Sequence, residues 1–195
     1  AALDGLGLDG CHRLIIVLIQ LVNLLLVGKP VRMSKRSGKA IALHDLLDEI
    51  SVDAARYFFN SRTPSSPLDF DLDLAIREDS ENPVYYVQYA NARICSLISR
   101  LAEEGELVPA AFQVDCALLH EPEALALIKS LAQYPEEIHL AAQSCDPSRI
   151  NRYLTGLAGD FHRFYNSCRI KREAPAVLSA RLKLADSVRQ VLALG

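Results

Sequence analysis

The segment from residue 29 to residue 39 is the part of the chain best suited to hold an anion. Five of its eleven residues are basic and none is acidic, while one glycine and two serines loosen the backbone. Its side chains offer ammonium, guanidinium and hydroxyl donors that suit a chain of phosphates. These donors belong to Arg32, Ser34, Lys35 and Arg36. Such a loop fits a reaction in which charge grows on a leaving pyrophosphate, although an exposed basic turn or a nucleic-acid patch remains open.

Three other short matches to ligand-binding patterns fail on residue type or position. "GLGLDG" resembles a dinucleotide fingerprint, but the four residues before it are too few for the strand that this motif requires. "GK" at residues 38–39 would end a phosphate-binding P-loop, yet Met33 stands where its first glycine belongs. "DFDLDL" spaces aspartates as a calcium loop does, but Leu74 replaces the required glycine. We therefore expect no metal site, and we expect Asp73 to cap the helix that follows.

Composition and charge exclude several classes of protein. Half of the 195 residues are apolar, which is enough for a packed core, and the net charge is −3. Residues 160–189 hold seven basic and three acidic residues, so we expect either a local anionic partner or a solvated helix face. The five cysteines lie far apart, which argues against a disulfide framework or a zinc site and favours buried thiols in a reducing cytoplasm. The apolar run 14–27 is too short to span a membrane, which takes about 20 residues.

The secondary structure predicted to position these residues changes along the chain from a strand to helices. Residues 14–27 are rich in β-branched residues and predict a strand buried on both faces of a parallel sheet, with a buried helix as the alternative. Two short helices are expected after residue 42, followed by a turn at "TPSSP". From about residue 80, helices dominate, and a proline stands at or near the start of each. These prolines are Pro83, Pro122, Pro135, Pro147 and Pro175, and the second and third are expected to open separate helices over 122–133 and 135–144.

Several segments of the chain resemble one enzyme family. "RMSKR" is similar to the K-M-S-K-S signature of class I aminoacyl-tRNA synthetases at Met33, Ser34 and Lys35, and departs from it at Arg32 and Arg36. "VDAARYFF", "LDFDLDLA", "NPVYYVQYANARI", "FHRFYNSCRI" and "RLKLADSVRQVL" follow in the order seen in bacterial-type arginyl-tRNA synthetases. The resemblance extends over essentially the whole chain.

The resemblance implies a mainly all-α fold with three parts. Residues 1–42 would be the end of an α/β nucleotide-binding catalytic domain, reduced to a strand and the signature loop. Residues 43–80 would be a helical connector that contacts the tRNA stem. Residues 81–195 would be a helical-bundle anticodon-binding domain that is truncated at its C-terminus. The chain starts without methionine and stops inside a helical pattern, so we expect it to be part of a longer protein.

The resemblance also implies an activity for that longer protein, which is the ligation of L-arginine to tRNA-Arg with ATP and Mg²⁺. Lys35 and Ser34 would be catalytic, and Arg32, Met33 and Arg36 would complete the ATP-binding loop. The family's H-I-G-H motif and its arginine pocket are absent from these 195 residues, so we expect this piece to be inactive alone and to hold no cofactor. The alternative is a non-enzymatic helical module that binds RNA or another protein.

The long helix that starts near Pro83 predicts where the anticodon would bind. With its buried face centred on Ile94, a helical period places Tyr86, Tyr89, Arg93 and Arg100 on one flank. Tyrosine can stack on an unpaired base and arginine can pair with phosphate, although the tyrosines could simply edge the core. Tyr153 and Lys171 are further candidates for the same role.

The apolar run 14–27 raises a separate expectation about assembly. If the rest of a catalytic domain does not cover it, we expect this segment to rearrange into a helix or to pair with a second copy of the chain. The full-length enzyme is expected to be a monomer.

Overall fold

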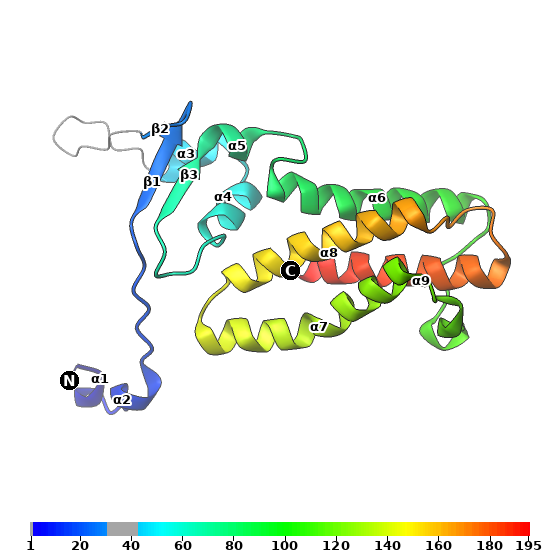
Figure 1. Ribbon diagram of the computed structural model, residues 1–195. Helices are drawn as coiled ribbons and strands as arrows, with labels where there is room; N and C mark the ends of the chain where they lie inside the picture. Colours follow the sequence, from blue (N-terminus) through cyan, green and yellow to red (C-terminus); the bar gives the residue numbers. More distant parts are fainter. Residues whose placement is uncertain (1, 31–42) are drawn as a thin grey trace.

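The computed structural model describes residues 2–30 and 43–195, and within them a small sheet with short helices stands beside a bundle of long helices (Figure 1). At the N-terminus, two one-turn helices, α1 (Ala2–Gly5) and α2 (Gly10–Arg13), lie away from both parts. An extended segment, residues 14–21, joins them to the sheet.

The sheet has the strand order β2-β1-β3. β1 (Val22–Leu26) pairs antiparallel with β2 (Lys29–Pro30) and parallel with β3 (Leu68–Asp71), with Leu24 opposite Phe70. Leu24 and Phe70 are buried in the core of this part of the chain. The register is reinforced by Asn23, whose side-chain amide donates to the Asp69 carboxylate at 2.9 Å.

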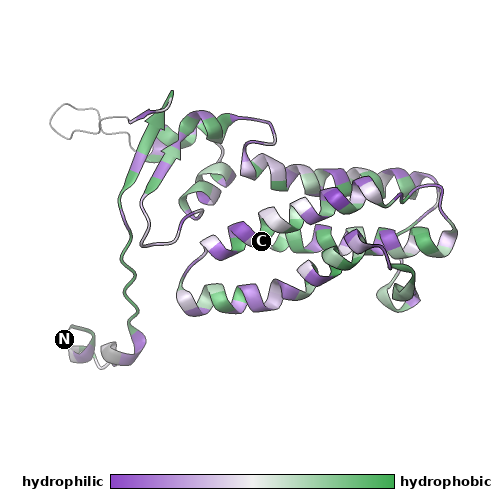
Figure 2. Cartoon of the chain, viewed as in Figure 1, coloured by the Kyte–Doolittle hydropathy of each residue, from purple (hydrophilic) through white to green (hydrophobic). Residues whose placement is uncertain are grey.

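The prediction of one buried strand over residues 14–27 is wrong for its first half. Residues 14–21 have no regular secondary structure and are exposed, and they do not form a helix either. Strand structure begins only at Val22, where β3 supplies backbone partners. Figure 2 shows most of this extended segment coloured as hydrophobic, and it lies outside the packed parts of the protein.

Three short helices complete the sheet-containing part: α3 (Leu43–Glu49), α4 (Val52–Phe59) and α5 (Leu72–Ile76). The Ser51 hydroxyl caps α4 by accepting from the Ala54 N–H. The prediction that Asp73 caps the next helix is wrong, because Asp71 accepts from the Leu74 N–H and so caps α5. Asp73 instead accepts from the Val27 N–H at 2.6 Å, which ties α5 to the end of β1.

The bundle consists of α6 (Pro83–Glu103), α7 (Pro122–Ser144), α8 (Ser148–Ser167) and α9 (Pro175–Leu194). Two 3₁₀ turns, η1 (Ala111–Gln113) and η2 (Cys116–Leu118), lie between α6 and α7. The predicted mainly helical architecture is confirmed. The face of α6 is also as predicted, since Val87, Ala90, Ile94, Leu97 and Leu101 are all buried.

The predicted break before Pro135 is wrong, because α7 runs through it. A proline inside a helix costs about 3 kcal/mol through a lost hydrogen bond and a steric clash. Leu127 before it and Ala141 after it are both buried, whereas Pro135 itself faces solvent. Tertiary packing of both halves therefore holds the helix together across the proline.

Among the described cysteines, Cys168 is buried, but Cys95 and Cys116 are exposed, so the expectation of buried thiols is wrong for these two. Over the ranges 2–30 and 43–195, no helix combines the length and the apolar character needed to cross a membrane. The three parts predicted from the sequence remain a prediction; β1, in the first of them, pairs with β3, in the second.

Candidate nucleic-acid interface

A hollow of about 760 Å³ lies between α6, α8 and the segment that follows α8. We call it the basic pocket. It is rich in cationic and aromatic side chains. Those that line it are Tyr89, Arg93, Arg100, Tyr165, Arg169 and Lys171. This arrangement could bind an anion that also carries a flat, apolar face.

Arg93 lines the basic pocket and contacts two of its aromatic rings. Its guanidinium carbon lies 4.1 Å from the centre of the Tyr165 ring and 5.9 Å from that of Tyr89. Cations are attracted to the faces of aromatic rings at such distances. Because Tyr165 belongs to α8 and the other two residues to α6, the contact joins the two helices at the pocket.

Tyr89 is the most accessible of these aromatic side chains. It is 46% exposed, and its ring is stacked 6.1 Å from that of Tyr85, with an angle of 12° between the planes. A second aromatic support comes from α8, where the His162 ring lies 5.9 Å from Tyr89 and 5.0 Å from Tyr86. Burial, followed by the charge of Arg93, lowers the pKa of His162 below its ordinary value of 6.5. His162 is therefore a neutral ring near pH 7.

The segment after α8 supplies two of the cations, because its side chains are alternately buried and exposed. Cys168 and Ile170 are buried in the core of the bundle, while Arg169 is exposed and Lys171 is partly exposed. An extended chain turns successive side chains to opposite sides, so burial of the first pair directs the basic pair outward. The Lys171 ammonium lies 2.6 Å from the Glu104 carboxylate at the end of α6.

The structure brings together most of the residues that the sequence singled out for RNA contact. Tyr89, Arg93 and Lys171 line the basic pocket, and Tyr86 supports it through His162. Tyr153 lies elsewhere, because its hydroxyl donates to the Ser130 carbonyl at 2.9 Å and its ring packs on Tyr134. Burial and the neighbouring Tyr134 raise the pKa of Tyr153 to about 12.

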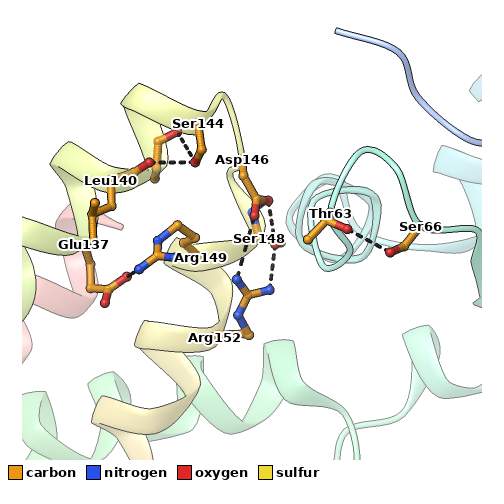
Figure 3. Close-up of polar contacts among 10 residues, drawn as sticks. Thr63, Ser66, Glu137, Leu140, Ser144, Asp146, Ser148, Arg149 and Arg152 are labelled. Atoms are coloured by element: carbon orange, nitrogen blue, oxygen red, sulfur yellow. Dashed lines mark hydrogen bonds and ion pairs between the residues drawn. The ribbon is translucent and has the colours of Figure 1, made fainter.

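Polar side chains at the opposite end of α8 are occupied with one another (Figure 3). Arg149 pairs with Glu137 at 2.9 Å, and Arg152 bonds to the Ser148 hydroxyl at 2.7 Å. Their charges are partly neutralised by nearby carboxylates. The basic pocket, at the other end of the helix, has Arg100 and Arg169 exposed.

The predicted catalytic residues Lys35 and Ser34, and the predicted ATP-binding residues Arg32, Met33 and Arg36, lie outside the described residues. Among the residues that the structure does describe, no group of three or more His, Cys, Asp or Glu could hold a metal ion.

Sequence reasoning missed His162, Tyr165 and Arg169 as parts of this pocket. Their segment, "FHRFYNSCRI", carried two signals: aromatic residues three apart on one helix, and the excess of basic residues after residue 160. Neither signal says which helix lies opposite, so only the packing of α8 on α6 reveals the site.

Comparison with known proteins supports the resemblance. Residues 87–195 match the family described as the DALR anticodon binding domain. The chain is 52% identical to the arginine–tRNA ligase of Acetivibrio thermocellus over 98% of its length, and 51% identical to that of Caldanaerobacter subterraneus over 98%. It covers 34% of each of these relatives, so it spans about a third of their length.

Solved structures agree. A crystal structure described as an arginyl-tRNA synthetase from Campylobacter jejuni has a TM-score of 0.81 and 33% identity, covering 98% of this chain and 40% of that one. Arginyl-tRNA synthetase from Thermus thermophilus shares the fold, with a TM-score of 0.61 over 82% of this chain and 27% of that one, at 22% identity. The family match begins inside α6 and runs to the end of the chain, and this chain belongs to the DALR anticodon-binding domain family.

Proposed function

We propose that this chain is the anticodon-binding part of an arginine–tRNA ligase, and that the basic pocket holds nucleotides of the anticodon loop of tRNA-Arg. The observation that carries this proposal is the contact between Arg93 and Tyr165 beside the exposed ring of Tyr89. It places aromatic faces beside exposed cationic side chains in one hollow, which is the chemistry that single-stranded RNA requires.

In this proposal each side chain has a separate task. An unstacked base lies on the Tyr89 ring, and the guanidinium of Arg93 borders the same base or its phosphate. Arg100, Arg169 and Lys171 neutralise neighbouring phosphates, which brings a steep dependence on salt. Tyr86 is a supporting residue, because it is partly buried against the core. Tyr153 takes no part in RNA contact.

The ligase activity would belong to the longer cytoplasmic protein, which joins L-arginine to tRNA-Arg with ATP and Mg²⁺. Lys35 and Ser34 would stabilise the charge on the leaving pyrophosphate, with Arg32, Met33 and Arg36 in the same loop. The likeness of "RMSKR" to the class I signature supports these roles. Both relatives are named arginine–tRNA ligase, which supports arginine as the amino acid.

A binding titration tests the proposal with this chain. Fluorescence anisotropy would measure the affinity of the chain for a labelled anticodon stem-loop of tRNA-Arg and for a blunt-ended RNA duplex with the same number of nucleotides. We expect tighter binding of the stem-loop, and Arg93→Met should weaken it by roughly tenfold, in the range found for one stacked base. Arg77→Met is the matched control, since Arg77 is paired with Glu81 outside the bundle. Equal binding of duplex and loop would refute anticodon recognition.

A further inference from the structure

Arg181 is a buried arginine of α9 that joins three separate segments of the bundle. The residue is 8% exposed. One guanidinium nitrogen donates to the main-chain carbonyl of Arg169, and the other donates to the carboxylate of Glu121. Glu173 approaches the first nitrogen at 3.7 Å. The side chain thus links α9 to the residue before α7 and to the segment that lines the basic pocket.

Burying a charge here destabilises the folded protein unless the charge is paired and hydrogen-bonded. Burial raises the pKa of Glu121, but a backbone hydrogen bond and Arg181 outweigh this effect and lower it overall. Glu121 is therefore ionised and pairs with Arg181 at neutral pH, while the buried Arg181 Nε and Glu121 Oε2 have no hydrogen-bond partner among the described residues. An apolar residue of similar size could fill the same volume at less cost, so the pair is better explained by the geometry that it imposes.

The pair determines which side chains of the segment after α8 face the core and which face the basic pocket. The Arg169 carbonyl that Arg181 holds belongs to the residue between Cys168 and Ile170, and both of these neighbours are buried. Fixing this carbonyl fixes the plane of the peptide, and so the direction in which the neighbouring side chains leave the backbone. Arg169 and Lys171 are the basic side chains of this segment that line the basic pocket.

We propose that Arg181 is a positioning residue for RNA binding, which holds the Arg169 carbonyl so that Arg169 and Lys171 face the basic pocket. Arg181 does not itself touch RNA. The inference rests on the proposed function, because it assigns Arg181 a role in the same pocket. Lysine at this position would keep the charge but would lose the planar fork that reaches the carbonyl and the carboxylate together.

The test uses this chain with three variants. Arg181→Met/Glu121→Gln removes both charges together, so that no buried carboxylate is left unpaired. Arg181→Lys is the conservative variant. Arg189→Met/Asp186→Asn is the matched control, because Arg189 pairs with the buried Asp186 on the same helix and lines a different hollow. Each protein is examined by thermal melting, by hydrogen exchange of the amides of residues 168–173, and by anisotropy with the anticodon stem-loop.

We expect Arg181→Met/Glu121→Gln to speed exchange at residues 168–173 and to weaken stem-loop binding about tenfold, within the range for coupled neighbours. Its salt slope should fall by about 1.4, since each phosphate contact on a single strand contributes about 0.7. Arg181→Lys should bind the stem-loop more tightly than the double variant but more weakly than the unmodified chain. The control should lower the melting temperature without changing exchange in that segment or the salt slope.

A further pair of proteins separates positioning from general stability. In an Arg169→Ala/Lys171→Ala background, Arg181→Met/Glu121→Gln should have no additional effect on binding, because the side chains that it positions are gone. An undiminished additional effect would overturn the proposal, as would unchanged exchange at residues 168–173 in the first variant. If the unmodified chain failed to prefer the stem-loop over the duplex, the proposed function would fall. The exchange data would still decide whether Arg181 holds the segment.

Discussion

The guanidinium carbon of Arg93 lies 4.1 Å from the centre of the Tyr165 ring, so a cation of α6 rests on an aromatic face of α8. The contact is built into the folded protein and joins two helices that are far apart in the sequence. Side chains that are already ordered lose less entropy when a ligand arrives. The pocket is thus prepared for a ligand that is both flat and anionic.

Tyr89 is expected to supply the stacking surface of that pocket. Tyr89→Ala should weaken binding of the anticodon stem-loop by about 1–3 kcal/mol, the usual contribution of one stacked base. Tyr89→Phe should retain most of the affinity, because the ring face rather than the hydroxyl makes the contact. Since Tyr89 is 46% exposed, the melting temperature should change little. Anisotropy titration and a thermal melt measure the two effects.

Phe112→Ala is the matched control for Tyr89, because Phe112 is an exposed aromatic residue that lies in η1 and does not line the basic pocket. It should leave RNA affinity unchanged. A Tyr89→Ala protein with normal affinity and a lowered melting temperature would instead assign Tyr89 to the core.

His162 is expected to make stability depend on pH. Burial and Arg93 lower its pKa in the folded protein below 6.5, so the unfolded chain takes up a proton first as the pH falls. Its contribution is therefore complete above about pH 6.5 and is lost below it, by at most about 1.4 kcal/mol per pH unit. His162→Phe keeps a flat ring against Tyr86 and Tyr89 but cannot be protonated.

Urea unfolding at about pH 7.5 and about pH 5.5 checks this sign. Wild-type protein should lose more stability between the two values than His162→Phe does, while the carboxylates common to both proteins cancel in the comparison. Equal losses would mean that His162 has an ordinary pKa in the folded state.

The α6 half of the pocket could be predicted from the sequence, because a long amphipathic helix fixes both its buried face and its flanks. The α8 half could not, since the distance from His162 to Tyr89 depends on how two helices pack. β3 was missed for a related reason. Asp69 and Asp71 look like turn residues, and their segment becomes a strand only because β1 pairs with it. Likewise, Pro135 predicts a break that packing overrides.

Tyr153 is expected to stabilise the bundle without contributing to RNA binding. Its hydroxyl donates to the Ser130 carbonyl, so Tyr153→Phe should lower the free energy of unfolding by about 0.5–1.5 kcal/mol. Stem-loop affinity should be unchanged, because the side chain lies outside the basic pocket. Chemical unfolding and anisotropy on the same sample measure both. A loss of affinity at normal stability would return Tyr153 to the RNA interface.

The joint between the sheet-containing part and the bundle depends on a reciprocal contact between α4 and α8. The Asn151 amide donates to the Tyr57 carbonyl at 2.7 Å, and the Tyr57 hydroxyl lies 2.6 Å from that of Thr155. The Tyr57 carbonyl is in the last turn of α4, where carbonyls lack partners within the helix. Asn151 therefore completes the end of α4 while it attaches that helix to the bundle.

Removing this contact should loosen the joint and leave the basic pocket intact. Asn151→Ala should lower the free energy of unfolding by about 1–3 kcal/mol, because it leaves a partly buried carbonyl unpaired. Hydrogen exchange should become faster in the last turn of α4, while residues 162–171 stay protected and stem-loop affinity is kept. Gln143→Ala, which removes an exposed amide from α7, should change none of these quantities. If Asn151→Ala weakened RNA binding as strongly as Arg93→Met, the pocket would depend on the joint, and the two parts could not be treated as separate in function.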